Sequence, residues 1–119
     1  MLSVRIGPVA VAAGLALGIV SSLGAAQAAD AAHGKILFTE KYGCYQCHGT
    51  VGQGGVTGPK LAPSPIPFET LSAFVRTSSG PMPPFRESVL PNGDLADIYA
   101  YLQSIPAGPG YKDIPLLNQ

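Results

Sequence analysis

The pentapeptide Cys44-Tyr45-Gln46-Cys47-His48 contains both cysteines of the chain and one of its two histidines. The two-residue spacer sets the sulfurs at about the separation of the two vinyl groups of a porphyrin, so each thiol can add across one vinyl and form a thioether. The adjacent histidine would then lie under the ring, where its imidazole can bind iron. The motif therefore predicts one haem c, attached covalently through Cys44 and Cys47, with His48 as the proximal ligand.

Three other kinds of site contain a C-x-x-C pair. A thioredoxin-like redox pair follows a strand in a βαβ unit, whereas the stretch before Cys44 has a helical pattern. A structural zinc ion takes four ligands, and His33 is the one further His or Cys that the chain offers. A plain disulfide of an exported protein stays open. It gives no reason, however, for a histidine directly after the pair, so haem attachment is the preferred interpretation.

Residues 1–28 have the pattern of a signal peptide. Arg5 and the free amine form a short positive region, residues 9–20 are an uncharged apolar run, and Ala-Gln-Ala at 26–28 is a small-x-small cleavage site. An uncleaved membrane anchor is the alternative, but the apolar run is shorter than the ~20 residues that a spanning helix needs. We therefore expect cleavage and export to the periplasm.

The remaining chain predicts a small domain, residues 29–106, followed by a Gly/Pro-rich tail, residues 107–119. Domains of this size bury a small share of their surface, so a cofactor commonly completes the core. The chain carries seven Lys and Arg against seven Asp and Glu, a formal net charge of zero at pH 7. No basic run is interleaved with aromatic residues, so we expect no nucleic-acid partner.

The spacing of apolar residues predicts an all-α domain with three main helices, at 30–42, 68–76 and 93–105. Asp30 is expected to cap the first helix and Asn92 the last. The segments between the helices are rich in Gly and Pro and predict long loops, which would wrap around the haem. The residues expected on the buried side of the second helix are Leu71, Phe74 and Val75.

Met82 is the candidate for the second axial ligand. It is the one thioether that remains after Met1 leaves with the signal peptide, and it lies far enough from His48 to reach the opposite haem face. Its flanking prolines restrict the backbone and would hold a projecting side chain in place. Met82 could instead fill a gap in the core, the usual role of methionine. His33, which is expected to face solvent, a lysine or an open site are the other possibilities for the sixth position.

These motifs occur in the order found in class I cytochromes c, which the chain resembles over nearly all of the predicted domain. Residues 34–38, with a Gly and an aromatic residue four apart, are similar to the family's first helix, and residues 97–102 resemble the closing helix that crosses it. Gly34 costs a helix about 1 kcal/mol relative to Ala. The resemblance supplies a reason, because Tyr101 or Ile98 would need that space. The implied fold is the cytochrome c fold, with long loops around one covalently attached haem.

The resemblance also implies a ligand set. Pro59, in Gly-Pro-Lys-Leu, matches a proline whose carbonyl accepts the other N–H of the proximal His48, a bond that fixes the orientation of the ring. Met82, before Pro-Pro-Phe, matches the distal ligand, so His/Met axial ligation is implied. The chain has no Trp, so the family's indole bond to a haem propionate is missing. The candidate replacements, which the sequence does not rank, are Arg76, Tyr99 and Lys60.

The implied function is that of a periplasmic one-electron carrier, not an enzyme, and hence of a protein without a small-molecule substrate. Its expected partners are redox proteins: a dehydrogenase, an oxidase or a cytochrome complex. The alternative is a haem enzyme or gas-binding sensor with an open sixth site, but the sequence offers no distal histidine near Met82. A bound subunit of a larger membrane dehydrogenase also stays open, because the tail carries an apolar patch at 114–117.

Overall fold

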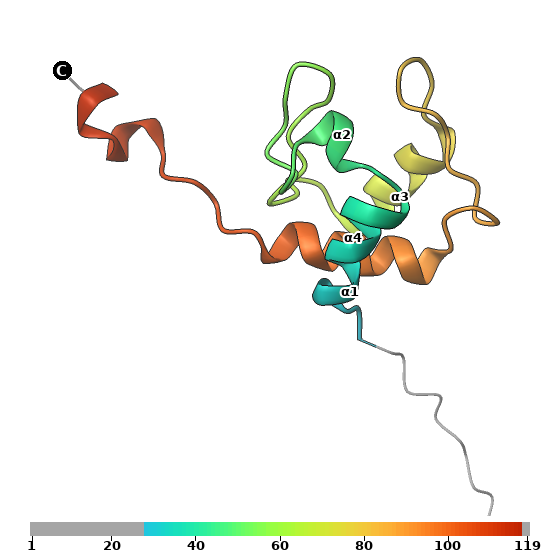
Figure 1. Cartoon of the computed structure of the whole chain (residues 1–119). Helices are drawn as coiled ribbons and strands as arrows, with labels where there is room; N and C mark the ends of the chain where they lie inside the picture. Colours follow the sequence, from blue (N-terminus) through green and yellow to red (C-terminus); the bar gives the residue numbers. More distant parts are fainter. Residues whose placement is uncertain (1–27, 118–119) are drawn as a thin grey trace, which may run out of the picture.

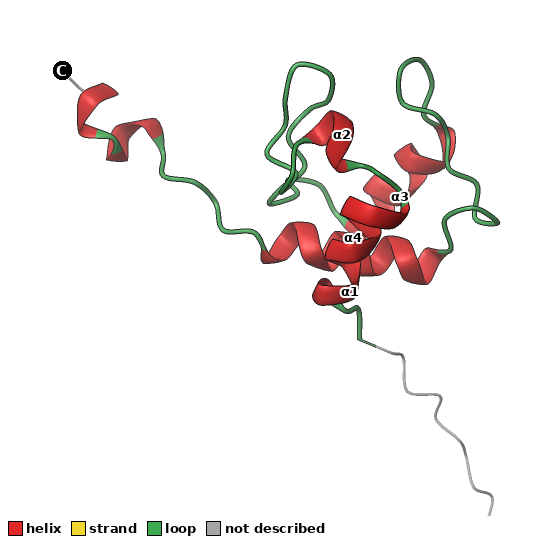
Figure 2. Cartoon of the chain, viewed as in Figure 1, coloured by secondary structure: helices red, strands yellow, loops and turns green. Residues whose placement is uncertain are grey.

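The computed structural model describes residues 28–117. The predicted signal peptide, apart from Ala28, lies outside the described residues, and so do residues 118–119 of the tail. Within the described range the chain forms helices and loops without a strand, which confirms the prediction of an all-α fold (Figure 2). No helix in this range is long and apolar enough to cross a membrane.

The first helix, α1 (Ala31–Ile36), begins at its predicted cap. The carboxylate of Asp30 accepts hydrogen bonds from the backbone N–H groups of Ala32, at 2.8 Å, and His33, at 3.1 Å. These bonds satisfy two of the donors that the start of a helix leaves unpaired. The start of the first helix was therefore predictable from one residue.

The chain then widens into η1 (Leu37–Lys41), a π-helical turn. The N–H of Tyr42 donates to the carbonyl of Leu37 at 2.9 Å. This bond joins residues five apart in sequence, whereas the bonds of an α-helix join residues four apart. Leu37 and Phe38 are adjacent in sequence, and both are almost fully buried. The helix predicted at 30–42 is present, but its second half is a π turn, which gives no separate signal in the spacing of apolar residues.

Two longer helices, α3 (Phe68–Thr77) and α4 (Asn92–Ser104), lie close to the predicted ranges. Asn92 is not a cap, since it is the first residue of α4 and makes no capping bond. Its side chain instead accepts a hydrogen bond from Arg76 and donates one to Glu87. The prediction for Asn92 is wrong because these partners lie outside the helix it begins.

The apolar side of α3 is divided between the core and a cavity. Leu71 and Val75 are buried as predicted, whereas Phe74 is 59 % exposed. Phe74 lines the cavity described below. The prediction for Phe74 is wrong because the spacing of apolar residues does not distinguish a cavity wall from a packed interior. The buried core consists of Leu37, Phe38, Ala62, Leu71, Val75, Leu90, Leu95, Ile98, Tyr101 and Leu102.

α1 crosses α4 at a point where the two backbones are in contact (Figure 1). A Cβ atom at Gly34 would overlap the carbonyl group of Asp97 and lie 2.9 Å from the backbone nitrogen of Ile98. The sequence correctly anticipates a close approach at Gly34. The space is filled by the backbone of α4, however, rather than by the side chain of Tyr101 or Ile98.

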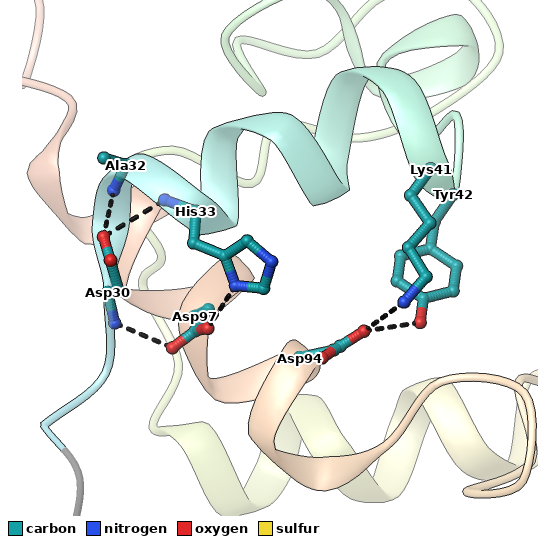
Figure 3. Close-up of polar contacts among 7 residues, drawn as sticks. All are labelled: Asp30, Ala32, His33, Lys41, Tyr42, Asp94 and Asp97. Carbon is teal, nitrogen blue, oxygen red and sulfur yellow. Dashed lines mark hydrogen bonds and ion pairs between the residues drawn. The ribbon is translucent and has the colours of Figure 1, made fainter.

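Asp97, on α4, holds the start of the first helix (Figure 3). Its carboxylate accepts a hydrogen bond from the backbone N–H of Asp30 at 2.7 Å and lies 2.8 Å from Nδ1 of His33. The hydrogen bond from His33 is the main cause that lowers the pKa of Asp97, and the bond from the backbone of Asp30 lowers it further. His33 has a 49 % exposed side chain. The expectation that it faces solvent is therefore half right, because one ring nitrogen is bonded to α4.

Asp94, one turn earlier on α4, holds the end of η1 (Figure 3). Its Oδ2 accepts hydrogen bonds from Nζ of Lys41 at 2.8 Å and from the hydroxyl of Tyr42 at 2.7 Å. The hydrogen bond from Lys41 is the main cause that lowers the pKa of Asp94, and the bond from Tyr42 lowers it further. The two carboxylates thus fix both ends of the first helical segment on α4.

The tail continues past α4 as two short 3-10 turns, η2 (Tyr111–Asp113) and η3 (Pro115–Leu117). Neither turn contains a buried residue, and the segment extends away from the helical core (Figure 1). None of the residues that line the candidate site belongs to this tail.

Replacing Gly34 by Ala tests the crossing of α1 over α4. Because backbone stands against backbone there, we expect Gly34→Ala to lower the free energy of unfolding by about 3 kcal/mol. Gly93→Ala is the matched control, since nothing lies within 4 Å of a Cβ at that position of α4. The measurement is chemical denaturation of both variants and the parent. Equal unfolding midpoints for the two variants would contradict the close contact.

Replacing Asp94 by Asn tests the hold on η1. A carboxylate whose folded-state pKa is lowered stabilises the protein above its unfolded pKa of about 4, and this contribution disappears as pH falls through the folded value. We expect Asp94→Asn to cost about 1 kcal/mol at pH 7, and the difference from the parent to shrink below pH 4. Denaturation between pH 7 and pH 3 measures it. Asp113→Asn, in the tail, should follow the parent throughout.

Candidate functional site

The C-x-x-C-H motif forms the single turn α2 (Tyr45–His48), with Cys44 directly before it. Cys44 is half-buried, Cys47 is exposed, and the two are not joined in a disulfide. The imidazole residue that ends the turn, His48, is only 8 % exposed. The turn therefore presents two thiols and one buried imidazole within a few residues of the exit from η1.

The ring of His48 is held by a backbone carbonyl. Its Nδ1 lies 2.9 Å from the carbonyl oxygen of Pro59. A carbonyl can only accept, so Nδ1 carries the proton and donates it. The other ring nitrogen, Nε2, then keeps a free lone pair that can bind a metal ion. The two residues that the resemblance pairs, His48 and Pro59, are thus in hydrogen-bond contact.

Gly58 is a residue of the site that sequence reasoning did not single out. A Cβ there would lie 2.7 Å from the carbonyl oxygen of Cys47 and 2.9 Å from Nδ1 of His48. The loop can approach α2 this closely because Gly58 has no side chain. Its position directly before Pro59 was the one available signal, since a residue beside the carbonyl that bonds His48 has to pass close to the ring.

These groups border an apolar cavity of about 490 Å³. Cys44, Cys47 and His48 line it together with Met82, which the chain brings from the loop after α3. Met82 is half-buried and packs against the core. Most of the remaining wall is apolar, contributed mainly by Phe38, Leu71, Phe74, Val75, Phe85 and Leu102. Residues distant in sequence thus converge on one hydrophobic space.

The other candidates for a sixth ligand do not line this cavity within the described residues. His33 is bonded to Asp97 and is not among the residues that line the cavity. None of the lysines between 28 and 117 borders it, although Lys60 lines an adjoining cavity of about 220 Å³. Met82 is therefore the candidate that shares the cavity with His48.

Two of the three candidates for a propionate contact already have protein partners. Arg76 donates to the carbonyl of Phe85 at 2.7 Å and to the side chain of Asn92 at 2.8 Å. The hydroxyl of Tyr99 donates to the carbonyl of Ile66 at 3.0 Å.

The structure disfavours a thioredoxin-like redox pair and a zinc site as interpretations of the cysteine pair. In the described part of the chain no strand precedes α2, and no three His, Cys, Asp or Glu side chains cluster as a metal site. Burial raises the pKa of the Cys44 thiol, which opposes formation of the reactive thiolate that a dithiol redox pair requires.

The arrangement fits a haem c. The cavity offers apolar walls for a flat hydrophobic ring, two thiols at its edge for thioether bonds, and an imidazole whose metal-binding nitrogen is free. A thioether side chain, that of Met82, borders the same space. Both classes of ligand, imidazole and thioether, are common for haem iron.

A family comparison agrees with this chemistry. The family model described as cytochrome C oxidase, cbb3-type, subunit III, matches residues 29–102. This span includes α1 to nearly the end of α4 and all the cavity residues named above. Comparisons with curated proteins and with solved structures gave no significant match. The resemblance to class I cytochromes c is thus confirmed, and the chain belongs to the family of the cbb3-type cytochrome c oxidase subunit III, as a class I-like c-type cytochrome domain.

Proposed function

We propose that this protein is a one-electron carrier that holds one haem c through thioethers at Cys44 and Cys47, with His48 and Met82 as axial ligands. A c-type cytochrome domain transfers electrons with a haem c; the attachment and the ligand set are the proposed part. The observation that carries the proposal is that the cysteine motif and Met82 line the same apolar cavity. When bound, the haem supplies an iron that gains and loses one electron.

His48 would act as a fixed, basic ligand. Its hydrogen bond to the Pro59 carbonyl, at 2.9 Å, sets the tautomer and the plane of the imidazole. Such a bond also raises the basicity of the metal-binding nitrogen. The chain thus prepares one axial ligand before any metal arrives.

Met82 would supply the second ligand as a neutral thioether. Histidine and methionine are both neutral, and this pair favours the reduced iron more than strongly donating ligand sets do. Both ligands can stay bound in either oxidation state, so little of the protein has to move during electron transfer. The apolar wall formed by Leu71, Val75 and Phe85 would limit solvent in the site and also raise the potential.

The partners of such a carrier are redox proteins. The matched family is described by an oxidase subunit, so a terminal oxidase complex is the first partner to test, before a dehydrogenase or another cytochrome complex. The signal peptide expected at 1–28 would place the exchange of electrons in the periplasm. In this proposal the domain is a carrier or a subunit of the complex and has no small-molecule substrate of its own.

Covalent attachment can be tested on protein made with haem-maturation machinery. Since thioethers survive denaturation, we expect the denatured chain to keep its haem colour and one haem of added mass by mass spectrometry. Cys44→Ala/Cys47→Ala should lose both. Extraction of the haem from the parent into acidified organic solvent would contradict the proposal.

Ligation by Met82 can be tested by replacing it with Ala. The ferric parent should show the weak long-wavelength absorption band of sulfur-to-iron coordination, and Met82→Ala should lose it and bind cyanide faster. Met82→His should instead lower the reduction potential by a sizeable part of the ~0.8 V range that axial ligands command. An unchanged band in Met82→Ala would show that Met82 is a core residue and not a ligand of the iron. A parent that lacks the band and binds carbon monoxide at once would favour a haem enzyme or gas sensor.

A further inference from the structure

The loop that carries Met82 has few hydrogen-bond donors of its own. It runs from Ser78 to Phe85, and Pro81, Pro83 and Pro84 contribute no backbone N–H. Such a loop cannot hold its shape through regular backbone pairing. Its carbonyl groups can accept hydrogen bonds from water or from side chains elsewhere in the chain, and the end of α3 provides two such side-chain donors.

Ser78 is the first of these donors. It follows α3 directly, and its hydroxyl donates to the carbonyl of Pro83 at 3.0 Å. Ser78 is only 6 % exposed, although the loop around it lies at the surface. A buried hydroxyl needs a partner, because an unpaired one costs free energy. The bond from Ser78 therefore fixes the carbonyl of Pro83, the residue that follows Met82.

Arg76, in the last turn of α3, is the second donor. Its Nη1 donates to the carbonyl of Phe85 at 2.7 Å, and its Nη2 to the side chain of Asn92 at 2.8 Å. The N–H of Phe85 in turn donates to the carbonyl of Val75 at 2.9 Å. Arg76 thus closes the base of the loop and ties it to the first residue of α4.

We infer that Arg76 and Ser78 are positioning residues for Met82, which keep its thioether directed into the cavity by holding the carbonyls on its C-terminal side. The inference rests on the ligation proposed above. A flexible loop would release its ligand through local opening, and a foreign ligand could then take the vacant position. Hydrogen bonds that exist only in the closed loop reduce the fraction of time spent open.

The experiment measures how fast imidazole replaces the sixth ligand in the ferric holoprotein. A charge-assisted hydrogen bond is among the stronger ones, so we expect Arg76→Met to raise the replacement rate about tenfold and to weaken the sulfur-to-iron band. Ser78→Ala should raise the rate less, and Arg76→Lys, which keeps one charged donor, should recover part of it. Ser78→Ala also provides a readout should Arg76→Met fail to mature.

Arg86→Met and Ser88→Ala are the matched controls, because both residues are exposed on the segment that follows the loop. They should exchange ligand at the parental rate. Parental rates in both Arg76→Met and Ser78→Ala would overturn the inference while leaving the ligation by Met82 intact. So would an Arg76 variant with a shifted potential and an unchanged exchange rate, since that would place Arg76 at a haem carboxylate. A parent without the sulfur-to-iron band would overturn the proposed ligation, and the inference with it.

Discussion

The contact between the backbones of α1 and α4 determines where everything else in the domain lies. At Gly34 the two helices are too close to admit a Cβ atom, so their relative position is set by backbone contact rather than by adjustable side chains. Asp97 and Asp94 then fix the two ends of the first segment on α4. Because α2 follows η1 after a short turn, its cysteines and imidazole are delivered to one side of this crossing.

The packed core and the apolar cavity share a wall. The residues of η1 and α4 pack against each other, and the rings of Phe38 and Tyr101 are in tilted contact, with centroids 5.7 Å apart and an interplanar angle of 54°. The same Phe38 also forms part of the cavity wall. A flat apolar group in the cavity would thus continue the core rather than occupy a separate pocket, which explains how so short a chain can support long loops.

The sequence predicts those parts of the fold that depend on local chemistry. The cap at Asp30 and the helical ranges follow from residue type and spacing, Met82 follows from being the one thioether outside the predicted signal peptide, and the family resemblance added Pro59. The π turn of η1 and the exposure of Phe74 were missed. The exposure of Phe74 depends on what lies opposite its helix face, a fact that a linear pattern does not contain. Asn92 was misread for the same reason, since its partners come from another helix and a turn.

The grip of α3 on the Met82 loop has a consequence for how freely that loop can vary. Arg76 and Ser78 bond to main-chain carbonyls, at Phe85 and Pro83, and a carbonyl is present whichever side chain is attached. These two bonds therefore depend on the backbone path of the loop and not on its side chains. Surface side chains of this segment could therefore be exchanged without loss of these two hydrogen bonds.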